Sequence, residues 1–233
     1  ADAVRCKRRE SIRLAEDFLH SVFLDMFGDP VKNSKEWPTV PLGELADIAS
    51  GVTKGKRYGG QSTVTVPYLS VSNVQDGHLA LDVVKGISVP VDEVNRYLLC
   101  DGDVLLTEGG DPDKLGRGTV WHGEIPRCLH QNHIFRVRPH RQIVPEYMSA
   151  LIGSQRGKRY FLRAAKQTTG IATINSSQLK AFPFLLPPVE LQIKYLQIVH
   201  AMQSLGSNLM LPDDAMDSLQ ASLCQRAFKD NAE

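Results

Sequence analysis

Two helical repeats of apolar residues bracket the chain. In each repeat, apolar positions recur at alternating spacings of three and four, which is typical of a helix that packs along another helix. The first helix is expected to end at Gly28-Asp29-Pro30 and the second to begin after Pro187-Pro188, because glycine and proline interrupt helices. The same spacing would also suit packing of either helix on the core of a domain. The positions expected at a helix interface are Ile12, Leu19, Val22, Met26, Leu191, Tyr195, Ile198, Met202, Leu205 and Leu209.

The segment between the helices, residues 30–188, combines short β-type runs with helical ones. Local patterns predict strands over 64–71, 103–107, 118–121 and 134–138, and helices over 145–152 and 155–166. Because these strands do not alternate regularly with long helices, we expect an α+β fold with short, partly barrel-like strands, not a doubly wound sheet. The chain is therefore expected to comprise a helix over 1–29, a mixed α/β domain over 30–188 and further coiled-coil-type helices over 189–233.

The composition is that of an ordinary globular protein. Hydrophobic residues make up 42% of the 233 residues and charged residues 23%, which leaves enough apolar material for a sizeable core. No apolar run approaches the ~20 residues of a membrane span, so we expect no membrane partner. Four scattered cysteines without a CxxC pair, together with a highly charged stretch over 1–13, favour a cytoplasmic protein with reduced thiols.

Charge is distributed unevenly along the chain, although the net charge is only +1. Residues 125–189 contain ten lysines and arginines and a single acidic residue, Glu146, whereas the segments on either side are slightly acidic. A protein with such a polarised field commonly presents its basic region to a polyanion. The pattern therefore favours nucleic acid as a partner.

Two basic stretches are candidates for contact with DNA. Residues 51–60 place lysine, arginine and tyrosine between glycines, which let the backbone approach a ligand closely. Residues 155–166 place four cations on one helix face without an acidic neighbour, an arrangement that an anion would stabilise. A solvated hairpin loop and a plain basic surface are the alternatives for the two stretches. The candidate DNA-binding residues are Lys54, Lys56, Arg57, Tyr58, Arg156, Arg159, Arg163, Lys166, Gln167, Thr168 and Thr169.

Patterns that would indicate catalysis are weak. Residues 51–56 are similar to a phosphate-binding loop, but they are one residue too short and lack its final serine or threonine. Glu108, Asp111 and Asp113 offer oxygen ligands for Mg²⁺, but the glycines and proline between them are more typical of a solvated turn. The cysteine and histidines of 128–133 do not have the spacing of a standard zinc site. We therefore expect no catalytic residue, metal or cofactor in this chain.

Several short motifs, taken in order, resemble the target-recognition domain of Type I restriction–modification specificity subunits. The helix end Met26-Phe27-Gly28-Asp29-Pro30 resembles the segment that often precedes the second recognition domain in this family. The resemblance covers nearly the whole chain. The motifs of the domain itself are Trp37-Pro38-x-x-Pro41-Leu42-Gly43-Glu44-Leu45-Ala46-x-Ile48-x-x-Gly51, Pro67-Tyr68-Leu69, Gly102-Asp103-Val104-Leu105, Gln131-Asn132, Gly170-Ile171-Ala172-Thr173-Ile174-Asn175 and Leu185-Leu186-Pro187-Pro188-Val189-Glu190-Leu191-Gln192.

The resemblance implies a non-catalytic subunit that recognises double-stranded DNA. Such a subunit directs methylation and restriction subunits to a bipartite site, and S-adenosylmethionine, ATP and Mg²⁺ belong to those partner subunits. Full-length family members carry two recognition domains, whereas this chain has one, so it corresponds to a C-terminal half or to a natural half-subunit. A second recognition half or a homodimer is then expected to complete the assembly. The alternative is a small DNA methyltransferase or nuclease fragment whose active site the motifs do not reveal.

Overall fold

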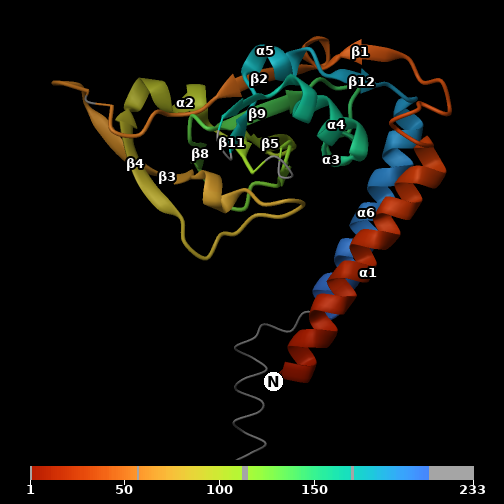
Figure 1. The fold of residues 1–233 in the computed structure, drawn as a ribbon. Helices are drawn as coiled ribbons and strands as arrows, with labels where there is room; N and C mark the ends of the chain where they lie inside the picture. Colours follow the sequence, from red (N-terminus) through yellow and green to blue (C-terminus); the bar gives the residue numbers. More distant parts are fainter. Residues whose placement is uncertain (1, 57, 112–114, 169–170, 210–233) are drawn as a thin grey trace, which may run out of the picture. The chain divides into compact units, whose positions relative to one another are not determined.

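The computed structural model describes residues 2–56, 58–111, 115–168 and 171–209 of the 233-residue chain. The chain divides into two compact units. Of the described residues, the smaller unit contains 2–22 and 197–209, and the larger unit contains Phe23–Leu196 (Figure 1). Arg57, Thr169 and the helices predicted over 210–233 lie outside the described residues.

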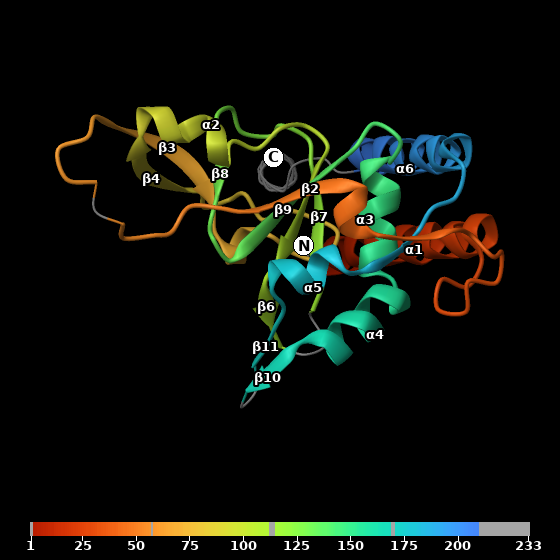
Figure 2. The same cartoon turned by 90° about the horizontal axis from the view of Figure 1, so that it is seen from above.

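Two long helices carry the apolar repeats from the ends of the chain. Helix α1 spans Asp2–Phe27 and helix α6 spans Val189–Leu209. Their parts within the smaller unit run alongside each other in opposite directions (Figures 1 and 2). Leu205, expected at a helix interface, is 58% exposed. The side chains of Ile12 and Leu209 lie outside the described residues. The remaining predicted positions are buried or half-buried, namely Leu19, Val22, Met26, Leu191, Tyr195, Ile198 and Met202.

The carboxyl end of α1 is closed by groups from the turn that follows it. Gly28 has a φ of +78°, a conformation that glycine tolerates best, and its N–H donates to the Leu24 carbonyl over 2.8 Å. Lys35 Nζ donates to two carbonyls of the last helical turn, at 2.9 and 3.1 Å. Trp37 Nε1 donates to the Phe27 carbonyl at 2.9 Å. The helix therefore ends where the Gly-Asp-Pro motif predicted.

The centre of the larger unit is a four-stranded antiparallel sheet in the order β2-β9-β5-β7. Every residue of β5 is buried, as expected for a central strand. The sequence predicted β5 and β7 with their observed bounds and β9 to within one residue, whereas it did not predict β2. The strands are β2 (Ala46–Ser50), β5 (Asp103–Thr107), β7 (Gly118–Trp121) and β9 (Ile134–Pro139).

A second sheet, in the order β4-β3-β8, lies beside the central one (Figure 1). Strand β3 pairs with β4 in antiparallel and with β8 in parallel orientation. Short helices follow β3 and β4. These elements are β3 (Thr63–Leu69), the 3₁₀ helix η2 (Val71–Asn73), β4 (Lys85–Pro90), the 3₁₀ helix η3 (Val91–Glu93), α2 (Val94–Tyr97) and β8 (Leu129–His130).

Smaller elements complete the larger unit. Strand β1 pairs with β12, and β10, β11 and β6 form a three-stranded sheet. The sequence predicted that the helix starting at residue 155 runs to Lys166, but α4 ends at Ala164, because Lys166 pairs with Thr173 across the β10–β11 ladder. The elements are β1 (Thr39–Pro41), η1 (Leu42–Glu44), β6 (Gly109–Gly110), α3 (Pro145–Gly153), α4 (Gln155–Ala164), β10 (Lys166–Thr168), β11 (Ile171–Thr173), α5 (Ser176–Lys180) and β12 (Pro183–Leu185).

The predicted α+β class is confirmed. The strands of the described residues form four separate sheets of two to four strands, and these do not close into a barrel. None of the described helices combines the length and the apolar character needed to cross a membrane. Cys6, Cys100 and Cys128 are free thiols.

Aromatic rings join the ends of both long helices to the larger unit. Phe23 and Phe27 of α1, Tyr147 of α3 and Tyr195 of α6 form a cluster with ring centroids 4.5 to 5.9 Å apart. Gln192 of α6 is fully buried and hydrogen-bonds two backbone groups at 2.9 Å. The larger unit therefore reaches about one and a half turns into α1 and about two turns into α6, past the limits at 30 and 188 that the turn residues predicted.

His130, the last residue of β8, is fully buried. Its Nδ1 lies 3.1 Å from the carbonyl oxygen of Tyr97. Burial, and to a lesser degree the charge of Arg136, lowers the pKa of His130 to about 4. The imidazole is therefore neutral in the folded protein at neutral pH.

Acid should destabilise the protein partly through His130. The unfolded chain binds a proton at this ring near its ordinary pKa of about 6.5, whereas the folded protein binds it only near pH 4, so stability is lost as the pH falls between these values. Between about pH 7 and 5, the free energy of unfolding should fall by about 2 kcal/mol more in the wild type than in His130→Asn, whose amide keeps a donor for the Tyr97 carbonyl. Urea unfolding at several pH values measures this difference, and parallel pH profiles would contradict it.

Candidate nucleic-acid interface

Several cations of the basic segment are held by other groups of the larger unit. Arg138 donates from Nε and Nη2 to the two carboxylate oxygens of Asp103, at 2.7 and 2.8 Å. Arg136 Nη1 lies 3.3 Å from each of two backbone carbonyl oxygens. Lys158 Nζ lies 3.8 Å from a carboxylate oxygen of Asp76. Because both carboxylates come from outside the basic segment, the charge excess along the sequence is partly neutralised in the fold.

Arg156, a predicted DNA contact, is bound within the protein. Its Nε donates to the Pro183 carbonyl at 2.8 Å and its Nη1 to the Pro30 carbonyl at 3.0 Å. The side chain is half-buried, and burial lowers its pKa. The guanidinium therefore ties α4 to β12 and to the turn after α1. Helical spacing alone could not show which cation the fold covers, and the predicted phosphate contact of Arg156 is replaced by hydrogen bonds to backbone carbonyls of the protein.

Arg159, Arg163 and Lys166 are exposed around the carboxyl end of α4 and the start of β10. Arg163 Nε lies 3.3 Å from the Arg159 carbonyl oxygen, one turn earlier in the helix. None of the described acidic residues forms an ion pair with these three cations. This row of cations, hereafter the cation row, is therefore the best-placed candidate for phosphate contact.

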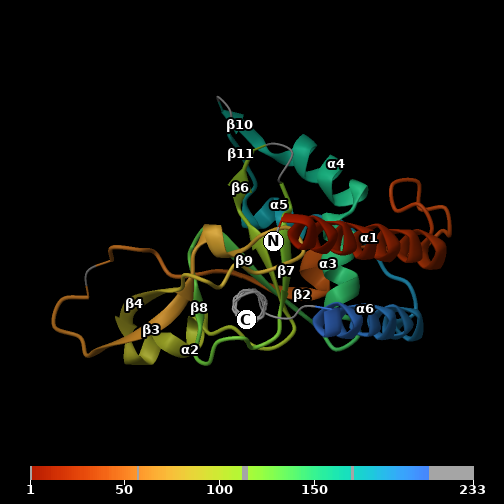
Figure 3. The same cartoon turned by 90° about the horizontal axis from the view of Figure 1, so that it is seen from below.

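Strands β10 and β11 form a hairpin where the sequence predicted a polar loop (Figures 2 and 3). Gln167 and Thr168 lie in β10, but their side chains are outside the described residues, as is Thr169 altogether. Strand β11 also pairs with the two glycines of β6. A Cβ on Gly109 would lie 2.7 Å from Thr173 Cγ2 and 2.8 Å from a β11 carbonyl oxygen. Glycine therefore allows β6 and β11 to approach closely enough to anchor the hairpin.

The glycine-rich loop of residues 51–60 leads from β2 to β3. Lys54 is exposed, whereas Lys56 Nζ lies 3.4 Å from Glu93 Oε1 and 5.0 Å from the ring centroid of Tyr58. Tyr58 is half-buried, and burial raises its pKa. In Figures 2 and 3 the loop projects from the edge of the unit that carries β3 and β4, and the hairpin from the edge that carries β6. The two predicted DNA-binding stretches thus leave different edges of the same unit.

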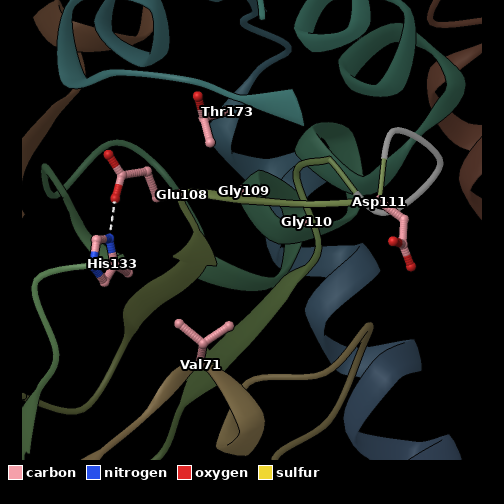
Figure 4. A pocket seen from close by; sticks show the side chains of 7 residues that line it. All are labelled: Val71, Glu108, Gly109, Gly110, Asp111, His133 and Thr173. Carbon is pink, nitrogen blue, oxygen red and sulfur yellow. Dashed lines mark hydrogen bonds and ion pairs between the residues drawn. The ribbon is translucent and has the colours of Figure 1, made fainter. Parts of the chain in front are cut away.

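A shallow hollow of about 400 Å³ lies between η2 and the sheet of β6 and β11 (Figure 4). Its lining also includes the end of β5 and the turn between β8 and β9, so four separate parts of the chain meet there. The lining residues are Val71, Glu108, Gly109, Gly110, Asp111, His133 and Thr173.

Glu108 and His133 form a short hydrogen-bonded pair in this hollow, with Nδ1 of His133 2.6 Å from Oε2 of Glu108. The backbone of Glu108 is held on both sides, since its N–H donates to the His133 carbonyl and its carbonyl accepts from the Ile174 N–H, both at 2.9 Å. Asn132 Nδ2 lies 3.4 Å from Nε2 of His133. Sequence reasoning did not predict this pair, although Gln131-Asn132 beside it belonged to the family resemblance.

Residues considered as metal ligands from the sequence either form other contacts in the structure or lie outside the described residues. Among the described residues, no group of three or more His, Cys, Asp or Glu side chains is placed to hold a metal ion. Glu108 bonds to His133, and Asp113 lies outside the described residues. Burial raises the pKa of Cys128 to about 12, so that this thiol stays protonated at neutral pH.

The family model of the Type I restriction modification DNA specificity domain matches residues 34–210. The chain belongs to this family. The match begins in the turn after α1 and runs through α6, and it thus includes the hollow, the hairpin and the cation row. The family match gives no support to the alternative of a methyltransferase or nuclease fragment.

Relatives of this DNA specificity domain include two specificity subunits of Type I restriction enzymes. The EcoKI specificity subunit of Escherichia coli (strain K12) is 28% identical over 160 residues, which are 68% of this chain and 34% of that subunit. The StySPI specificity subunit of Salmonella potsdam is 23% identical over 202 residues, which are 83% of this chain and 42% of that subunit. The chain thus spans less than half the length of either relative.

Two crystal structures share the fold of this DNA specificity domain. The HsdS subunit from Thermoanaerobacter tengcongensis has a TM-score of 0.52 at 17% identity, covering 97% of this chain and 54% of that one. The Type I S subunit from M. genitalium has a TM-score of 0.53 at 14% identity, covering 94% and 54%. The fold of this chain therefore corresponds to about half of each larger subunit.

Proposed function

We propose that this chain recognises a specific DNA sequence as the specificity subunit, or half of the specificity subunit, of a Type I restriction–modification complex. In this role it directs methylation and restriction subunits to a bipartite site and carries no catalytic groups of its own. S-adenosylmethionine, ATP and Mg²⁺ are then bound by those partners. The family match over residues 34–210 carries the proposal, and the exposed cation row supports it.

Phosphate and base contacts have separate places in this proposal. Arg159, Arg163 and Lys166 neutralise phosphates, which orients the domain on the duplex without reading its sequence. Base edges are read by the glycine-rich loop, through Lys54 and Tyr58 among others, and by groups near the hairpin. This division is typical of proteins that bind a defined DNA site.

The two long helices are the proposed contact surface for the protein partners. Leu14 and Phe18 stand one turn apart on α1 and are 54% and 48% exposed. Leu205 on α6 is 58% exposed. Exposed large apolar side chains at helical spacing favour contact with another protein. We assign this surface to the methylation subunit and to a second recognition half or a second copy of this chain.

Selection from a pool of randomised duplexes tests sequence recognition, and salt dependence tests the cation row. The chain should enrich one sequence from the pool. The double variant Arg159→Ala/Arg163→Ala should bind the selected and scrambled duplexes more weakly by the same factor. Its slope of log affinity against log salt should be lower by about two units, since each phosphate contact contributes about 0.9.

The control for the double variant is Lys32→Ala, which removes an exposed cation from the turn after α1. This change should leave the salt slope unaltered. Titrations from about 50 to 200 mM salt, the range in which counterion release has a large effect, measure the slopes. No enriched sequence would refute the proposed function, whereas an unchanged slope in the double variant would refute only the assignment of the cation row.

A further inference from the structure

Glu108 presents a carboxylate oxygen that the other described residues leave open to a ligand. Oε2 is taken by His133, but Oε1 has no hydrogen-bond partner among the described residues. The Glu108 side chain is 32% exposed and that of His133 is 56% exposed, so a ligand reaches both. Figure 4 shows one carboxylate oxygen turned toward His133 and the other turned away from it.

The position of this acceptor is determined by several elements at once. The backbone of Glu108 is hydrogen-bonded to His133 and to Ile174, which ties the end of β5 to the turn before β9 and to the chain after β11. Nδ1 of His133 donates to the Glu108 carboxylate, which can only accept, and Asn132 Nδ2 lies 3.4 Å from Nε2 on the other side of the ring. A side chain supported in this way suits discrimination between ligands, because little entropy is lost when it binds.

The hollow lies next to elements that suit the major groove of DNA. Strands β10 and β11 form a hairpin that pairs with β6 through Ala172 and Thr173, and B-DNA admits a two-stranded ribbon in its major groove. Lys166 of the cation row pairs with Thr173 in this ribbon, and Thr173 lines the hollow. A duplex whose phosphates meet the cation row therefore has base edges within reach of the hollow.

A carboxylate at this place selects among base edges. Phosphates repel it, and so do the acceptor atoms of guanine and thymine in the major groove. The donors available there are the exocyclic amino groups of cytosine and adenine. The charge of Glu108 therefore opposes binding to most sequences and favours a site that offers an amino group, which is how a repulsive group contributes specificity.

We propose that Glu108 reads one base pair of the target by accepting a hydrogen bond from the exocyclic amino group of cytosine or adenine. His133 is the positioning residue that orients the carboxylate. The proposal rests on the DNA recognition proposed above. It adds a specificity-determining residue that lies outside both basic stretches.

Base analogues test the contact atom by atom. The duplex is the one selected by the 233-residue chain. In a series of duplexes, one cytosine at a time is replaced by pyrimidin-2-one, or one adenine at a time by purine, and each replacement removes only the amino group of that base. The wild-type protein should lose about tenfold in affinity at one position, the size expected for one base contact. Glu108→Ala should bind the unmodified duplex about tenfold more weakly and be insensitive to the analogue at that position. His133→Ala should reduce the sensitivity at the same position and at no other.

The matched control is Asp47→Asn, which removes a carboxylate that also faces an imidazole, that of His140 at 3.9 Å, on strand β2 outside the hollow. This variant should keep the analogue sensitivity of the wild type.

Equal weakening of Glu108→Ala binding to all duplexes, with the analogue sensitivity retained, would show a structural role and overturn the proposal. An enriched sequence with no position sensitive to the analogues would overturn it too, while leaving the proposed function intact. Failure to enrich any sequence would refute the proposed function and this inference with it.

Discussion

Arg138→Met should lower the free energy of unfolding of the larger unit by about 3 kcal/mol. The carboxylate of Asp103 is fully buried, and it accepts two hydrogen bonds from Arg138 and a third from the Cys100 N–H at 2.7 Å. The hydrogen bonds of Arg138 to Asp103 raise the pKa of the guanidinium, which therefore stays charged beside this carboxylate. Methionine fills a similar volume but leaves a buried negative charge without its counter-charge. Urea unfolding followed by tryptophan fluorescence measures the loss, because Trp37 and Trp121 both lie in the larger unit.

The reverse change should cost less, because the two partners differ in exposure. The Arg138 side chain is 36% exposed, whereas that of Asp103 is 0% exposed. In Asp103→Asn the guanidinium turns to water and the amide oxygen still accepts from Cys100, so we expect a loss of about 1–2 kcal/mol. A loss in Asp103→Asn equal to or greater than that in Arg138→Met would contradict this account of the pair.

The sequence predicted the elements whose signal is local. Strands β5 and β7 have their predicted bounds, since a short apolar run between turn residues indicates a buried strand whatever it pairs with. Helix α3 begins at Pro145, where proline at the first helical position predicted it. Strands β1 and β6 were missed because their residues become strands only through partners far along the chain. Two glycines, as in β6, would by themselves indicate a turn.

The candidate site was predictable in its charge but not in its contacts. The basic segment indicated a polyanion partner, and Arg159, Arg163 and Lys166 are exposed as expected. Sequence could not show that Arg156 bonds to the Pro30 carbonyl, 126 positions away. Nor could the sequence show that Glu108 contacts His133, 25 positions away, because that contact depends on the pairing of β5 with β9. Patterns along the chain therefore identify the kind of surface, and tertiary pairing decides which side chains remain free.

Phe27→Ala should lower the free energy of unfolding of the larger unit by about 3–5 kcal/mol. Phe27 is 2% exposed, and its ring centroid lies 4.5 Å from that of Tyr147, 5.0 Å from that of Phe23 and 5.6 Å from that of Tyr195. These rings come from α1, α3 and α6, so the cavity left by alanine is lined by three helices that other contacts hold in place. Because the helices cannot collapse together, the loss should include a cavity contribution as well as the lost burial. Urea unfolding followed by tryptophan fluorescence measures it.

Phe18→Ala is the matched control for this prediction. Phe18 lies in the same helix and undergoes the same chemical change, so any gain in helix propensity is common to the two variants. Its side chain is 48% exposed, and truncation there should change the free energy of unfolding by about 0.5 kcal/mol or less. The difference in the free energy of unfolding between the two variants then measures the contribution of the aromatic cluster, separately from any effect of the substitution on the helix itself. Equal losses in the two variants would mean that the cluster does not hold the end of α1 on the larger unit. A large loss confined to Phe27→Ala means that the unit to be tested for DNA binding must retain the end of α1.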